Sequence, residues 1–188
     1  DTLSLHDALP ISKAYPDLKG TRQKYAGMLT AMDEAVGQIA AAIDAAGMRR
    51  DTLFIFSSDN GGPSPGQITD NGPLRAGKGT LYEGGTRVVA FATWDGKISA
   101  GSTVNAALHM VDWYPTLLAM TETAMPAGVT VRGRNVVPLL RGTPVPGWNN
   151  DFYAEYSMRV YAETDMRAYR TARWKLVRDF NNPARDEL

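Results

Sequence analysis

A carboxylate and a carboxamide stand side by side in the sequence, directly after a run of apolar residues. Asp59 and Asn60 follow the segment TLFIFSS and precede Gly61 and Gly62. Their oxygen atoms suit a hard cation such as calcium or magnesium better than zinc, and two glycines let the backbone bend close to an ion. Aspartate, asparagine and glycine are also the usual residues of a tight turn, so a turn is the simpler interpretation of these letters alone.

A lysine between glycines is the second candidate. The segment GPLRAGKGT nearly spells a nucleotide-binding P-loop, but Gly79 stands where the magnesium-binding hydroxyl would be. Pro73 and the lack of a strand before it also argue against that motif, so we reject a nucleotide site. Lys78 is nevertheless suited to hold a tetrahedral oxyanion, because it is a point charge among free backbone amides. The alternative is a solvated lysine in a loop.

The remaining polar candidates receive structural interpretations. Glu83 and Arg87 could pair or line a cleft, but the double glycine between them favours close packing before the next strand. His109 opens a predicted short helix. A lone histidine there is more typical of a helix cap or a packed residue than of a catalyst.

The elements that must position the first candidates follow from hydrophobic periodicity. Apolar residues at steps of three and four predict an amphipathic helix from Thr21 to Ile43, with Gly47 as its stop. The run TLFIFSS predicts a strand buried on both faces, and a helix followed by such a strand is typical of a parallel α/β sheet. Ligands bind beyond the carboxyl ends of such strands, so Asp59 and Asn60 are expected to face a cleft.

The second half of the chain changes character. Residues 88–94 predict another apolar strand, and residues 108–120 predict a short helix in which Pro115 falls about two turns in, where a proline kinks a helix. Residues 121–150 are rich in loops and prolines. Alternating apolar and polar residues then predict an antiparallel sheet from three segments, 151–157, 166–172 and 174–180.

Composition excludes several classes of function. The 188 residues hold 20 basic and 20 acidic side chains, so no net field attracts nucleic acid or an anionic membrane. No apolar run reaches the roughly 18 residues of a membrane span. The absence of cysteine excludes disulfides, thiolate metal sites and a cysteine nucleophile within this chain. Residues 1–12 show no clean period and are interpreted as a non-native leader.

Taken together, these segments resemble the sulfatase family, in wording closest to its arylsulfatases. The resemblance runs from about Tyr25 to the end and is carried by TLFIFSSDNGG, PLRAGKGTLYEGGTRV, HMVDWYPTLLAM and RTARWKLVRDF. It implies an alkaline-phosphatase-like α/β fold, with a mostly parallel sheet and flanking helices, that is incomplete here. Residues 13–150 would be the C-terminal part of the catalytic domain, and residues 151–188 the start of a small antiparallel C-terminal subdomain.

The resemblance also implies a chemistry, the hydrolysis of sulfate esters. Asp59 and Asn60 would bind a calcium ion (Ca2+), and Lys78 would contact the sulfate group of an aryl sulfate or a sulfated sugar. The family's nucleophile is a formylglycine made from the first residue of a [CS]-x-P-x-R motif. Members usually act in the periplasm, in lysosome-like compartments or outside the cell.

The sequence departs from the family pattern at the nucleophile. One segment, NGPLR, matches the motif in part, but Asn71 stands where the nucleophile should be. The family places the nucleophile, the remaining metal ligands and the histidine base upstream of Tyr25. We therefore expect a fragment that is inactive alone. Two alternatives stay open, a phosphodiesterase-like relative of the same superfamily and a non-catalytic module that binds sulfated glycans. The particular ester and the oligomeric state stay open too.

Overall fold

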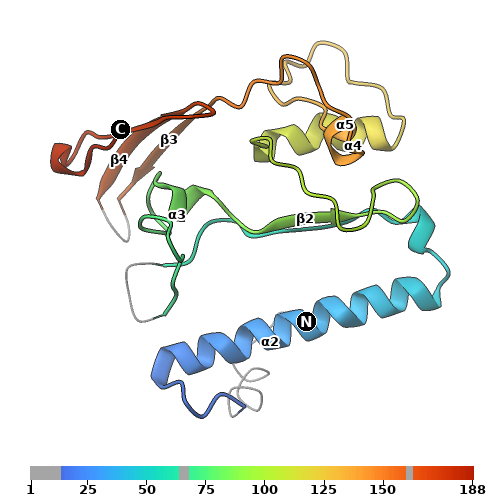
Figure 1. The fold of residues 1–188 in the computed structure, drawn as a ribbon, viewed down its shortest axis with the longest axis horizontal. Coiled ribbons are helices and arrows are strands. Elements are labelled where there is room, and N and C mark those ends of the chain that lie inside the picture. The colour runs from blue at the N-terminus through green and yellow to red at the C-terminus, as the bar shows by residue number, and fades with distance from the viewer. Residues whose placement is uncertain (1–13, 64–67, 160–162) are drawn as a thin grey trace. The chain divides into compact units, whose positions relative to one another are not determined.

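The computed structural model describes residues 14–63, 68–159 and 163–188, whose helices and strands are drawn in Figure 1. The chain divides into two compact units. The first unit reaches Ala92, and the second runs from Thr93 to Leu188. The expected leader, residues 1–12, lies outside the described residues, and the expected domain boundary at residue 150 stays a prediction. None of the helices in the described ranges combines the length and the apolar character needed to cross a membrane.

The predicted long helix is present as α2, Gly20–Ala45. It ends in a Schellman motif, in which Gly47 N–H donates to Asp44 O at 2.9 Å and Met48 N–H donates to Ile43 O at 3.0 Å. Gly47 takes a φ of +67°, a left-handed conformation that glycine adopts without a steric penalty. The glycine stop is therefore confirmed. A short 3-10 turn, η1 (Arg49–Asp51), leads into the next strand.

Two short strands form the sheet of the first unit. β1 (Phe54–Ser57) is hydrogen-bonded to β2 (Ala90–Thr93), and the rings of Phe56 and Phe91 stack at 5.1 Å. The expectation that the first strand is buried on both faces is wrong for this chain, because every residue of β1 is only half-buried. The physical reason is that the described sheet has two strands, so little of its surface is covered.

A four-residue helix that the sequence did not indicate, α3 (Glu83–Thr86), precedes β2. Leu81 and Tyr82, just before it, are among the most buried apolar side chains of the chain. Gly84 and Gly85, inside it, are buried as well. This confirms that the double glycine serves close packing, and the contacts that require it belong to the candidate site.

The helix predicted for residues 108–120 begins later than expected. The structure has a 3-10 turn, η2 (Met110–Asp112), followed by α4 (Trp113–Met120). His109 caps this segment in a capping box with Asp112, which confirms its interpretation as a cap. Pro115 therefore lies in the first turn of α4. Backbone N–H groups in the first turn have no acceptor within the helix, so a proline there removes no hydrogen bond and the expected kink has no cause.

Asp112 and Thr116 fasten the following loop to α4. The two carboxylate oxygens of Asp112, a residue only 3% exposed, accept from His109 N–H and Arg134 N–H, both at 2.8 Å. The Thr116 hydroxyl donates to Asp112 O at 2.6 Å and accepts from Val136 N–H at 3.0 Å. The loop thereby delivers the buried Val136 to the start of α5 (Val137–Leu140).

The C-terminal segments form the predicted antiparallel sheet. Its strands are β3 (Phe152–Met158), β4 (Thr164–Arg170) and β5 (Lys175–Asp179), in the order β3-β4-β5, and a 3-10 turn, η3 (Pro183–Arg185), follows. Met166, Ala168 and Val177 are buried on one face. The alternation seen in the sequence therefore reports the two faces of this sheet correctly.

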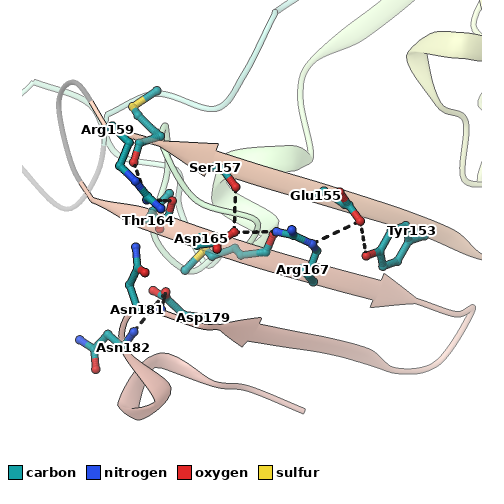
Figure 2. A network of polar contacts seen from close by, with 12 residues as sticks. Tyr153, Glu155, Ser157, Arg159, Thr164, Asp165, Arg167, Asp179, Asn181 and Asn182 are labelled. Carbon is teal, nitrogen blue, oxygen red and sulfur yellow. Dashed lines mark hydrogen bonds and ion pairs between the residues drawn. The ribbon is translucent and has the colours of Figure 1, made fainter.

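Charged side chains on the other face of β3 and β4 pair with one another (Figure 2). Arg167 contacts Glu155 Oε1 at 3.2 Å and Asp165 Oδ1 at 2.7 Å. The Ser157 hydroxyl donates to Asp165 Oδ1 at 2.7 Å, and that bond, followed by the one from Arg167, holds the pKa of Asp165 below its usual range. Tyr153 donates to Glu155 at 2.6 Å, which raises the pKa of the phenol.

Candidate functional site

The candidate metal loop begins one residue after β1. Ser58 continues the strand pairing, since its N–H donates to Val89 O at 3.0 Å, and its hydroxyl donates to Asn60 O at 2.8 Å. Asp59 is exposed and Asn60 is half-buried. The side-chain NH₂ of Asn60 donates to Gly61 O at 3.0 Å, so its carbonyl oxygen Oδ1 is the atom that can bind a cation. Both candidate metal ligands thus stand directly beyond a strand end, as the sequence predicts.

The candidate lysine loop is hydrogen-bonded to the metal loop. The backbone N–H of Lys78 donates to Gly62 O at 3.1 Å, and Gly61 N–H donates to Gly85 O at 3.0 Å. Segments that are far apart in the sequence therefore meet through their backbones. The Lys78 side chain itself is exposed.

The contacts between these loops are so close that they admit only glycine. A Cβ atom added at Gly61 would lie 1.6 Å from Gly84 O, and one added at Gly84 would lie 2.2 Å from Ala76 O. At Gly85 a Cβ would lie 2.3 Å from Thr80 O. Each obstacle is a backbone carbonyl, which has little freedom to move. The glycines of SDNGG and EGG therefore act together as one packing surface.

Asn71 is the residue of this region whose role the sequence did not reveal. Its NH₂ group donates to Gly62 O at 2.9 Å and to Ala76 O at 2.8 Å, and its Oδ1 accepts from Gly62 N–H at 3.1 Å. One side chain thus joins the loop of Asp59 to the loop of Lys78. Asn71, which stands at the nucleophile position of the partial motif NGPLR, is a structural bridge in this chain.

The bridge ends at a strained residue. Ala76 has a φ of +57°, a left-handed conformation that costs a residue with a Cβ about 1–2 kcal/mol. Beside it, Arg75 O accepts from Gly84 N–H at 2.9 Å, and the Arg75 guanidinium lies 4.1 Å from the centre of the Tyr82 ring. Such strain persists only where surrounding contacts fix the backbone, as they do immediately before Gly77 and Lys78.

Two candidate side chains of these loops, Asp59 and Lys78, have no partner among the described residues. Within the part of the chain that the structure describes, neither the Asp59 carboxylate nor the Lys78 ammonium makes a hydrogen bond or an ion pair. Both are therefore available to a ligand. Whether they point into one cleft stays a prediction.

A cleft of about 580 Å³ opens beside the metal loop within the first unit. Asn60 and Arg87 line it, together with apolar side chains of α2 and of the sheet such as Leu29 and Phe56. The described residues that line it do not include Asp59 or Lys78. Of the candidate metal ligands and Lys78, only Asn60 lines the cleft, together with Gly61, Gly62 and Asn71 of the adjoining loops.

The donor atoms present fit part of a calcium site. Asp59 and Asn60 offer oxygen ligands, the kind that calcium takes, but calcium takes about 6–8 of them. Among residues 14–63, 68–159 and 163–188, no three histidine, aspartate or glutamate side chains gather where they could hold a metal ion. A calcium ion bound here would need further oxygen ligands besides Asp59 and Asn60.

Comparison with known proteins decides the family. The sequence profile described as Sulfatase matches residues 2–123, which include both loops and β1. The chain belongs to the sulfatase family. A second profile, described as N-sulphoglucosamine sulphohydrolase, C-terminal, matches residues 76–188 of this sulfatase chain.

Individual relatives agree with the profiles. The sulfatase chain is 37% identical to arylsulfatase A of Homo sapiens over 172 residues, which are 86% of this chain and 33% of that protein. The chain covers 19% of the length of arylsulfatase J of Mus musculus. The chain thus spans about a fifth to a third of the length of these curated relatives.

Solved structures show the fold. The structure of Ps i-CgsB in complex with k-i-k-neocarrahexaose has a TM-score of 0.81 and 29% identity, over 93% of this chain and 38% of that one. The phosphonate monoester hydrolase of Agrobacterium radiobacter has a TM-score of 0.67 and 26% identity, over 84% and 32%. The expected alkaline-phosphatase-like α/β fold, followed by a small antiparallel sheet, is confirmed.

Proposed function

We propose that this chain is the part of a sulfuric ester hydrolase that carries the sulfate-binding lysine and two calcium ligands. One observation supports this most directly. In a chain of the sulfatase family, two hydrogen-bonded loops present a carboxylate, Asp59, and an ammonium, Lys78, that have no partner among the described residues. A site that binds an anionic group and a cation needs charged side chains that are free to contact them and a rigid backbone that holds these side chains in place.

The roles of the residues follow from their charges. The Lys78 ammonium would contact the non-bridging oxygens of the sulfate and stabilise the negative charge that they bear in the transition state. Asp59 and Asn60 Oδ1 would hold a calcium ion. Bound there, calcium would supply a further positive charge beside the sulfate oxygens. The nucleophile, a formylglycine, is expected from a part of the enzyme outside this chain.

The substrate is proposed at the level of the ester class. Relatives of this chain include arylsulfatases, and the structure of Ps i-CgsB holds a neocarrahexaose. An aryl sulfate or a sulfated sugar is therefore the class to test first. We also propose a periplasmic, secreted or lysosome-like location, which is usual for the family.

A phosphonate monoester is the second candidate substrate, because one solved neighbour is named as a phosphonate monoester hydrolase. A lysine between glycines would bind either tetrahedral oxyanion. The loops therefore do not distinguish sulfur from phosphorus, and only a comparison of rates does.

The test is a side-by-side assay of the purified full-length enzyme. We expect kcat/KM for 4-nitrophenyl sulfate to exceed kcat/KM for a phenylphosphonate monoester. The reverse order would assign the chain to a phosphonate hydrolase. Turnover of neither ester, nor of a sulfated sugar, would favour a binding module. The 188-residue chain alone should show no turnover, because its nucleophile is missing. Hydrolysis in proportion to its concentration would contradict that assignment.

A further inference from the structure

The three hydrogen bonds of Asn71 form a clasp between the two functional loops. Its carboxamide accepts from Gly62 N–H and donates back to Gly62 O, as a neighbouring strand would, and its second N–H reaches Ala76 O. Both hydrogens and the oxygen of the amide are thereby used. The side chain is half-buried, so water competes less for these bonds than at an exposed site.

The two ends of the clasp lie next to the residues that the proposed chemistry needs. Gly62 follows the candidate ligands Asp59 and Asn60, and its carbonyl also accepts the backbone N–H of Lys78. Ala76 precedes Lys78 by two residues and is held at a positive φ. The Asn71 side chain therefore fixes the start of the lysine turn and the carbonyl to which Lys78 is bonded.

We propose that Asn71 is a positioning residue, which sets where the Lys78 ammonium stands relative to the Asp59–Asn60 loop. This inference rests on the proposed function, since it matters to catalysis only if Lys78 contacts the reacting group. Asn71 itself touches neither substrate nor metal in this account. It acts through the backbone of Lys78, so its effect on the reaction depends on the presence of that lysine.

The polarity of the clasp suggests a matched pair of variants. Asn71→Ala removes all three bonds. Asn71→Asp keeps the volume and the acceptor for Gly62 N–H, but it sets a carboxylate oxygen against Gly62 O and Ala76 O, where the native NH₂ donates. Both variants should therefore loosen the loops. Asn105, an exposed asparagine of the other unit, offers the control Asn105→Ala.

Hydrogen exchange of the 188-residue chain tests the clasp without any catalytic assay. In Asn71→Ala the amide of Gly62 loses its acceptor and should exchange about tenfold faster, as expected for the loss of a hydrogen bond. In both variants the amide of Lys78 should also exchange faster, because its acceptor Gly62 O is no longer held by the Asn71 NH₂ group. The amide of Gly47, bonded within the end of α2, serves as an internal reference. Unchanged exchange at Gly62 and Lys78 would overturn the proposal.

A double-mutant cycle in the full-length enzyme tests the coupling to Lys78, with whichever ester the enzyme hydrolyses faster. Asn71→Ala should lower kcat by about tenfold or more, with a smaller change in KM, because a displacement of about 1 Å costs up to about 10²-fold. In a Lys78→Ala background the same change should have less than about a twofold effect. If the fold-loss in kcat of the double variant equalled the product of the two single losses, Asn71 would not act through Lys78. If the unmutated enzyme did not hydrolyse the sulfate ester faster than the phosphonate ester, the proposed function itself would fail.

Discussion

Two regions of the chain treat their charged side chains in opposite ways. On the C-terminal sheet Glu155, Arg167 and Asp165 are bonded to one another, and each charge has an opposite partner (Figure 2). In the loops between β1 and β2, the described backbone is bonded tightly while Asp59 and Lys78 have no partner within the described residues. One region pairs its charged side chains with one another, and the other leaves two of them without a partner among the described residues.

The difference separates charges that serve the fold from charges that are open to a ligand. A pair such as Glu155 and Arg167 on a solvated sheet contributes little to stability and nothing to binding. An unpaired lysine is ordinary on a surface, but Lys78 follows a strained residue and close contacts between glycines. The cost of building such a loop is explained if its exposed charge has a function.

The largest effect should come from filling a contact between the loops. Gly84→Ala places a methyl group 2.2 Å from Ala76 O and should destabilise the chain by about 1–3 kcal/mol or more. The matched control is Gly37→Ala, in the interior of α2, where a Cβ meets nothing within 4 Å. That change should stabilise by about 0.5–1 kcal/mol. Denaturant unfolding of both variants gives the comparison.

Equal effects of the two glycine variants would contradict the packing that the structure shows between α3 and the lysine turn. A large loss in Gly37→Ala would do so as well. A Gly84→Ala protein that keeps full stability would mean that the loops are loose and that Lys78 is not held in place.

A smaller effect is expected from the charges of the sheet. Arg167→Ala removes the cation shared by Glu155 and Asp165 and should cost less than about 1 kcal/mol, because all three groups are in contact with solvent. The loss should shrink further in 1 M salt. Arg132→Ala, at an exposed arginine of the same unit, is the control for unfolding measurements. A loss of several kcal/mol, unaffected by salt, would mean that this region is built around its charges after all.

The smallest effect is a shift in the titration of one side chain. The Ser157 hydroxyl, and after it Arg167, lowers the pKa of Asp165. A lowered pKa in the folded state means that Asp165 stabilises the sheet above the pKa of an unfolded aspartate, and that this contribution is lost as the pH falls through the folded value. Ser157→Ala should raise the pKa of Asp165 toward the ordinary value in an NMR titration. An unchanged pKa would show that the hydroxyl does not bond to this carboxylate.

Much of the fold could be predicted because it depends on periodic patterns. Apolar residues at steps of three and four gave α2, and Gly47 marked its end. Alternation gave the three strands of the C-terminal sheet. The start of α4 was missed by five residues, because His109 and Asp112 make a cap whose signal is weaker than the apolar residues around it.

Within the candidate site, the sequence could single out only the side chains that are proposed to meet a ligand. Asp59 and Asn60 follow a strand, and Lys78 stands between glycines, so their types and places were readable. The role of Asn71 was not, since all its partners are backbone atoms, five to nine residues away. Every residue has a backbone N–H or C=O group, so the sequence does not show which of them a side chain will bind. The double glycine indicated close packing in the sequence, but only the structure shows which carbonyl groups lie against it.

The most direct test of the account is a calcium titration of two variants of the full-length enzyme. Lys78→Ala should lower kcat/KM by about 10² or more, like the loss of an oxyanion-hole donor, and added calcium should not restore it. Lys78→Arg should recover only part of the loss, because a planar fork does not reproduce a compact charge. Asp59→Ala should instead weaken calcium binding, so that high calcium restores part of the activity. Near-normal kcat/KM in Lys78→Ala, or its rescue by calcium, would show that Lys78 is only a solvated lysine and would contradict the account.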